Sequence, residues 1–199
     1  MPGLAPGIHA FLRGKQDVDS RDKPGHDAHR NGTMIDRAYV QRMARYNRWQ
    51  NENLYGAADT LSDDERRRER GAWFGSIHKT LNHLLWGDQM WMSRFTDLPQ
   101  PTVGIPESVN LYPDWDNLKS ERTAFDRKIL DWADRVDGAW LAADQTFYSV
   151  ATKRDWTRPR WVLVTHLFNH QTHHRGQVHG MLTQAGGRPG DTDLTFLPD

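Results

Sequence analysis

The chain has 199 residues, a length that suits one domain with a real core, and its 26 basic residues balance its 26 acidic ones. A formal net charge of zero argues against a protein whose main task is to bind nucleic acid. The absence of cysteine excludes disulfides, thiolate zinc sites, iron–sulfur clusters and a cysteine nucleophile, and leaves the ten histidines as the main ligands for a soft metal.

Residues 1–33 differ in composition from the rest of the chain. They hold three of the ten prolines and five of the sixteen glycines, and residues 17–27 are polar and aperiodic. Such a segment buries too little surface to offset its ordering entropy, which predicts a disordered or irregular tail. Its amino-acid sequence also resembles a short repeat at the N-terminus of many predicted bacterial proteins, which implies an over-extended gene start with Met34 as the initiator. The alternative is a genuine arm that packs on a partner subunit.

The apolar segments of the chain are short. There is no run of about 18 apolar residues, so no membrane-spanning helix is expected. The stretch at residues 7–12 is too brief for a secretory signal and contains a histidine. We therefore expect a cytoplasmic protein that does not act at a membrane.

The first half of the chain predicts two long helices. Apolar residues recur at spacings of three and four from Ile35 to Ala57, which is typical of a helix. The segment Ser62–Glu65 has the pattern of a capping box. Arginines 66–68 lie between two glutamates, which favours a solvated face over a nucleic-acid patch. The second helix is predicted from Trp73 to Phe95, and because it is apolar nearly all round it should be central.

The second half predicts two more helices. Four prolines predict a loop over residues 96–113. A third helix is expected from Trp115 to Val136, and residues 139–158 indicate a short hairpin or an extended link. The last helix should start near Pro159 and reach about Ala185. Four long amphipathic helices with modest loops predict an all-α fold, a four-helix bundle.

Five histidines fall within residues 166–179 of the last predicted helix. At about 3.6 residues per turn, His170 and His174 share a core-facing stripe, and their spacing brings two imidazoles close enough to share one metal ion. Each buried ring needs a partner for both nitrogens, which a metal or a hydrogen-bonded core pair would supply. Gln171 stands where a zincin has glutamate, which removes the usual metalloprotease base. The other histidines lie at the edge or on the far side of this stripe: His166, His173 and His179.

A third ligand is sought on the second predicted helix. His78 and His83 are five residues apart and therefore point in different directions. His78 lies in the more polar part, whereas His83 lies deep in the apolar run. Alone, His83 fits an ordinary core histidine; beside His170 and His174 it becomes a candidate ligand. Small neighbours on its face would leave room for an ion, namely Thr80 and Gly87.

Several residues near these histidines leave alternatives open. Asp88 could orient a ligand histidine, or form an ion pair or cap the next helix. Arg175 follows His174 and points away from it, which favours a salt bridge or a subunit contact over substrate binding. Three tryptophans could wall a pocket, but their helical spacing favours core positions: Trp86, Trp91 and Trp132.

Two segments, which are specific when they occur together in this order, resemble motifs of the DinB family of bacterial stress-associated proteins. They are Leu-Asn-His-Leu-Leu-Trp-Gly-Asp-Gln-Met-Trp at 81–91 and His-Leu-Phe-Asn-His-Gln-Thr-His-His-Arg-Gly-Gln at 166–177, and residues 43–51 are similar to the family's first helix. The resemblance covers about residues 34–187 and implies that 34–199 is an up-down-down-up four-helix bundle, usually dimeric. It also implies a divalent metal, zinc or nickel, held by three ligands: His83, His170 and His174.

The resemblance also suggests what such a site does. Relatives in the broader superfamily include metal-dependent transferases and isomerases that use low-molecular-weight thiols. We therefore expect a metal-dependent thiol transferase or a hydrolase that activates a thiol or water against an unidentified small molecule. The alternatives are a non-catalytic metal-binding stress-response protein, and a structural homodimer in which the histidines are a remnant. The sequence assigns no general base, and its neutral charge argues against direct nucleic-acid binding.

Overall fold

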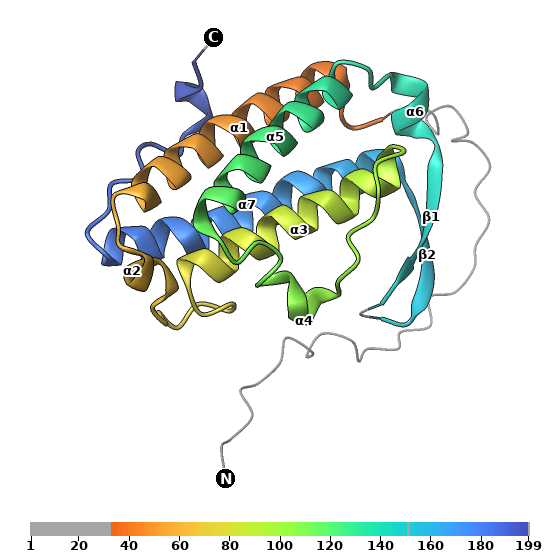
Figure 1. Ribbon diagram of the computed structural model, residues 1–199. Helices are drawn as coiled ribbons and strands as arrows, with labels where there is room; N and C mark the ends of the chain where they lie inside the picture. Colours follow the sequence, from red (N-terminus) through yellow and green to blue (C-terminus); the bar gives the residue numbers. More distant parts are fainter. Residues whose placement is uncertain (1–32, 151, 199) are drawn as a thin grey trace, which may run out of the picture. The chain divides into compact units, whose positions relative to one another are not determined.

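The structure is a computed structural model, which describes residues 33–150 and 152–198. These residues are largely helical and include one two-stranded antiparallel sheet (Figure 1). The long helices are α1 (Arg37–Asp59), α3 (Ile77–Phe95), α5 (Trp115–Ala133) and α7 (Arg160–Gln184). The shorter elements are α2 (Asp63–Arg67), α4 (Ile105–Ser108), α6 (Gly138–Ala142), η1 (Leu194–Phe196), β1 (Asp144–Ser149) and β2 (Arg154–Pro159). The tail predicted over residues 1–33 lies outside the described residues, apart from Thr33.

Side-chain caps fix where several helices begin. The Ser62 hydroxyl accepts a hydrogen bond from the backbone N–H of Glu65, as the capping pattern predicts. The Ser76 hydroxyl accepts from the N–H of Lys79 and starts α3 at Ile77. The predicted start at Trp73 is therefore wrong: Trp73 lies in the preceding turn and is 72% exposed. The spacing of four residues from Trp73 to Ile77 continues the helical pattern through this turn, but the Ser76 cap decides where α3 begins.

Arg66 departs from the solvated face predicted for residues 66–68. Its side chain is buried, and its guanidinium donates to the backbone carbonyls of Ala58 and Leu61. The last carbonyls of a helix and those just after it have no helical N–H partner, so a nearby donor stabilises them. Arg67 and Arg68 are exposed, as predicted.

The two connecting segments contain more helix than the sequence predicted. The proline-rich loop includes α4, in whose first turn Pro106 fits because its missing N–H would be unpaired there. The segment before the last helix contains α6 and then the hairpin of β1 and β2, in which Phe147 pairs with Trp156. The hairpin alternative for residues 139–158 is thereby confirmed. Pro159 directly precedes α7, as predicted.

One apolar cluster fills the space between the long helices. Helix α3 packs along α7, while α1 packs along both α5 and α7. The central position expected for α3 is confirmed, because it also contacts α2, α4 and α5. Its side chains Ile77, Leu81 and Leu85 are completely buried.

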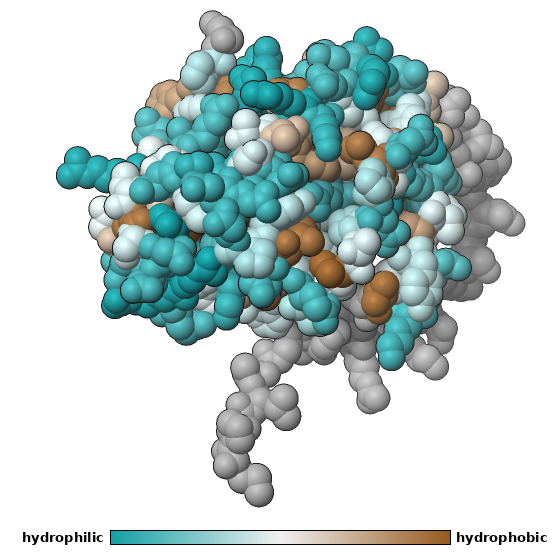
Figure 2. All heavy atoms as spheres, viewed as in Figure 1, coloured by the Kyte–Doolittle hydropathy of each residue, from teal (hydrophilic) through white to brown (hydrophobic). Residues whose placement is uncertain are grey.

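On the face shown in Figure 2, hydrophilic side chains predominate and apolar ones appear in small separate groups. Among the described residues, no helix combines the length and the apolar character needed to cross a bilayer.

Candidate metal centre

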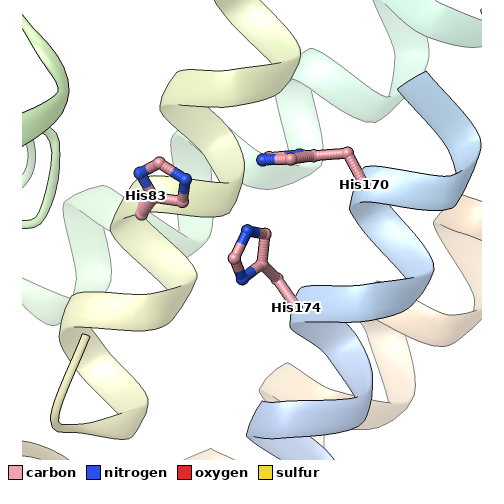
Figure 3. A group of neighbouring side chains, drawn as sticks. All are labelled: His83, His170 and His174. Carbon is pink, nitrogen blue, oxygen red and sulfur yellow. The ribbon is translucent and has the colours of Figure 1, made fainter. Parts of the chain in front are cut away.

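Three histidine rings from two helices point toward one another (Figure 3). His83 comes from α3, and His170 and His174 come from successive turns of α7. One ring nitrogen of each residue lies within 4.8 Å of the others. The ring centroids are 4.5 Å apart for His170 and His174, and 4.9 Å apart for His83 and His174. This spacing suits a group that holds one metal ion.

A hydroxyl group fixes the orientation and tautomer of His83. Its Nδ1 lies 2.8 Å from Oγ of Ser108 in α4. The hydroxyl proton of Ser108 is already donated to the carbonyl of Ile105 at 2.6 Å, so Oγ accepts and Nδ1 must carry the proton. The lone pair of Nε2 is then free for a metal, which is how a partner at the far nitrogen prepares a ligand histidine.

The other two rings differ in their partners. Nδ1 of His174 lies 2.9 Å from Oε1 of Gln177, which can only accept, so Nε2 of His174 is also left with a free lone pair. Nδ1 of His170 is buried and has no hydrogen-bond partner among the described residues. A buried nitrogen without a partner is costly, and an ion would remove that cost. The donor set therefore fits a divalent metal.

Gly87 makes room for one of the rings. A Cβ atom added at this glycine would lie 2.7 Å from Cε1 of His170. The sequence indicated free space beside Gly87, and the ring of His170 fills it. Two aromatic rings also stack on His83: Phe74 with a centroid distance of 3.9 Å, and Trp86 with one of 5.6 Å. The His83 ring is therefore packed against aromatic side chains.

Replacing Gly87 with alanine is expected to weaken metal binding by roughly 10- to 100-fold while the fold persists, because the added methyl group displaces a ring rather than backbone. A matched control is Gly180→Ala on α7, where nothing lies within 4 Å of the new Cβ. It should keep full affinity and gain about 0.5–1 kcal/mol of stability. Titration with zinc against a chromogenic chelator measures the metal affinity of the two variants. Equal affinity in the two variants would contradict the close fit of His170.

Burial keeps the three rings neutral near pH 7. Burial, with a smaller contribution from His174, lowers the pKa of His83 to about 3. Burial also lowers the pKa of His170 to about 3, and lowers that of His174 against the opposing effect of Gln177. The neutral imidazole is the form that binds a metal, so these rings need no deprotonation at neutral pH.

The metal-free protein should therefore lose stability in acid. A histidine whose pKa is lower in the folded chain binds its proton more weakly there than in the unfolded chain. Stability is then fully present above the unfolded pKa of about 6.5 and falls as the pH drops toward the folded pKa of about 3 for His83 and His170. Denaturant unfolding of the metal-free chain between pH 7.5 and 4 measures this. A free energy of unfolding that stays constant over that range would show that the rings are not held neutral.

A buried ion-pair cluster lies beside the three histidines. The two Asp88 carboxylate oxygens accept from Arg122 at 2.6 Å and from Gln171 at 2.9 Å, and Arg122 also donates to Asp126 at 2.8 Å. The ion-pair alternative for Asp88 is thus confirmed. Burial raises the pKa of both carboxyls, and Arg122 opposes that rise. Because Gln171 follows His170, this cluster ties α7 to α3 beside the rings.

The same cluster extends to the first helix. Asn47 and Asn51 donate to Asp126 from α1, and Arg175 donates to the side-chain oxygen of Asn47. Arg175 is 5% exposed, so its side chain is part of the interior. Among the described residues it forms no ion pair within 4 Å, and the salt bridge expected for it is not found. Side chains of all four long helices meet in this cluster.

The remaining candidates are not part of the group of three ring nitrogens. His78 is buried rather than in a polar region, and it contacts Asn82. His166 is exposed, and its ring packs on Trp91 with a centroid distance of 4.9 Å. His173 is exposed and contacts Gln177, and His179 lies at the Gly190 carbonyl. All three tryptophans proposed as pocket walls are at least half-buried, and Trp86 alone among them stacks on His83.

Sequence reasoning missed the roles of three residues that shape the site, namely Ser108, Phe74 and Gln171. Ser108 and Phe74 come from connecting segments, and no local pattern marks either as a neighbour of His83. Most of the predicted stripe is buried, but Gln171 is completely buried whereas His170 is only half-buried, so the buried face of α7 extends one residue beyond that stripe. The buried polar residues Gln171 and Arg175 lie on successive turns of α7, and this spacing was the signal in the sequence for the wider buried face.

A comparison with family models finds one that matches residues 34–199, described as the DinB family. No curated protein matches the chain.

Proposed function

The chain belongs to the DinB family, and we propose that it is a divalent-metal protein whose ion is held by His83, His170 and His174. One observation carries the proposal: three ring nitrogens from α3 and α7 lie within 4.8 Å of one another. The hydrogen bonds at Nδ1 of His83 and His174 support it, because they leave Nε2 of both rings free. Zinc and nickel are the proposed ions, since imidazole nitrogen suits both.

The proposed activity is that of a metal-dependent transferase or hydrolase. An ion held by three neutral imidazoles keeps an open position and lowers the pKa of a water or a low-molecular-weight thiol there. Ser108 and Gln177 hold two rings in place, and Phe74 and Trp86 shield His83 from water. Asp88 is bound by Arg122 and Gln171, so it is not free to act as a general base.

We also propose the up-down-down-up arrangement of a four-helix bundle for the long helices. In Figure 1, α1 and α7 run in one direction along the molecule and α3 and α5 run in the other. The packing of α3 on α7, and of α1 on α5, pairs helices of opposite direction. This arrangement brings the middle of α3 beside the middle of α7, where the three histidines lie.

Elemental analysis of the purified, tag-free protein tests the metal proposal. We expect about one zinc, nickel or similar ion per chain, which a chelator removes and added metal restores. A chain that carries no metal and takes up none when it is supplied would contradict the proposal.

A non-catalytic metal-binding protein is the second candidate. It is favoured by the burial of two of the rings, since His83 is 5% and His174 is 7% exposed, which leaves a substrate little access to the ion. A small thiol added to the cobalt-substituted protein separates the candidates. A new sulfur-to-cobalt absorption band would show an accessible ion and favour the enzyme, and an unchanged spectrum would favour the non-catalytic protein.

A further inference from the structure

Arg94, near the end of α3, is a half-buried cation that lies against two aromatic rings, which also contact each other edge to face. Its Cζ lies 4.4 Å from the ring centroid of Trp91 and 4.7 Å from that of Phe147 in β1. Among the described residues, its guanidinium donates no hydrogen bond and has no carboxylate within 4 Å. Burial lowers the pKa of this guanidinium, so its charge is partly desolvated, and no described carboxylate pairs with it.

Two buried arginines elsewhere in the chain have hydrogen-bond acceptors for their terminal nitrogens. The guanidinium of Arg66 donates to backbone carbonyls, and that of Arg122 donates to two carboxylates. The Arg94 side chain is only partly buried, so solvent can reach it. Because both rings lie on neighbouring sides of the guanidinium, its remaining donors are available to bind a carboxylate through two parallel hydrogen bonds.

A continuous series of rings connects Arg94 to the three histidines. The centroid of His170 lies 6.0 Å from that of His166, and His166 lies 4.9 Å from Trp91, which contacts Arg94. These residues follow the contact between α3 and α7 from the candidate metal site toward the hairpin. The charge of Arg94 also lowers the pKa of His166, after burial, as expected for near neighbours.

We propose that Arg94 anchors the anionic end of the substrate, a small organic molecule that carries a carboxylate at one end and its reacting group at the other. The proposal rests on the proposed function, because it places the reacting group at His83, His170 and His174. Seven residues of α3 separate Gly87 from Arg94, a rise on the order of 10 Å. The substrate class is therefore an elongated carboxylate, long enough to span that distance along the side chains of Trp91 and His166.

A pair of thiols that differ in one charge tests this role. We would measure the dissociation constants of 8-mercaptooctanoate and 8-mercapto-1-octanol on the cobalt-substituted protein, from the sulfur-to-cobalt band. The acid is expected to bind about tenfold more tightly than the alcohol. The Arg94→Gln variant should lose this preference while its affinity for the alcohol is unchanged. The matched control is Arg158→Gln, which removes an exposed arginine stacked on Trp156 of the same hairpin and should keep the preference.

The outcomes separate this proposal from the metal proposal. An unchanged preference for the acid in Arg94→Gln would overturn the anchoring role. Arg94→Lys, which keeps the charge but not the planar fork, should retain part of the preference, and it serves if the glutamine variant does not fold. If cobalt does not bind, the proposed function fails, and calorimetry of octanoate with the metal-free protein tests Arg94 alone. There the glutamine variant should again bind about tenfold more weakly, and equal binding would overturn the anchor.

Discussion

Replacing any one of His83, His170 or His174 with alanine is expected to reduce the bound metal from about one ion per chain to a trace. Each substitution removes one of three nitrogen donors that lie within 4.8 Å of one another. Two imidazoles and solvent bind a divalent ion far more weakly than three imidazoles. The loss of metal affinity should therefore exceed the roughly 10- to 100-fold loss that follows from changing a residue that only supports a ligand. Elemental analysis after dialysis against metal-free buffer measures the result.

The controls for this experiment are histidines of the same two helices. His179→Ala on α7 and His78→Ala on α3 should keep the full metal content, because neither residue belongs to the group of three. Circular dichroism of each variant shows whether the helices persist without the ring. Full metal content in any one of the three ligand variants would refute the three-histidine site.

Replacing Arg122 with methionine is expected to destabilise the chain by about 3–5 kcal/mol, because it leaves Asp88 and Asp126 buried without their cation. The Arg122 side chain is 3% exposed, and those of Asp88 and Asp126 are 0% and 4% exposed. A carboxylate in such surroundings loses its hydration and needs a compensating charge. Denaturant unfolding followed by circular dichroism measures the change in the free energy of unfolding.

An exposed ion pair provides the control. Lys119 pairs with Asp59 at 2.9 Å on the surface, so Lys119→Met should cost at most about 1 kcal/mol. The triple variant Arg122→Met, Asp88→Asn and Asp126→Asn should recover part of the loss, because it removes the uncompensated charges as well. If Arg122→Met costs no more than Lys119→Met, the buried cluster does not hold the helices together as described.

Local patterns were sufficient to predict the long helices. Their periodicity depends on contacts between residues three or four apart, and the Ser62 cap that starts the short helix α2 is equally local. The same local rule places His170 and His174 on neighbouring turns of one helix face. The starts of α3 and α4 were missed, because a cap at Ser76 and a short helix after Gly104 leave little periodic signal.

The tertiary structure decided everything that joins distant parts of the chain. Ser108 meets His83 across 25 residues, and Arg122 meets Asp88 across 34. No pattern along the sequence carries such pairings, because they depend on how whole helices pack. How the helices pack also explains why Gln171 and Arg175 lie in the interior although their side chains are polar. The sequence by itself determined which residues are able to bind a metal, and the packing of α3 against α7 decided that they meet.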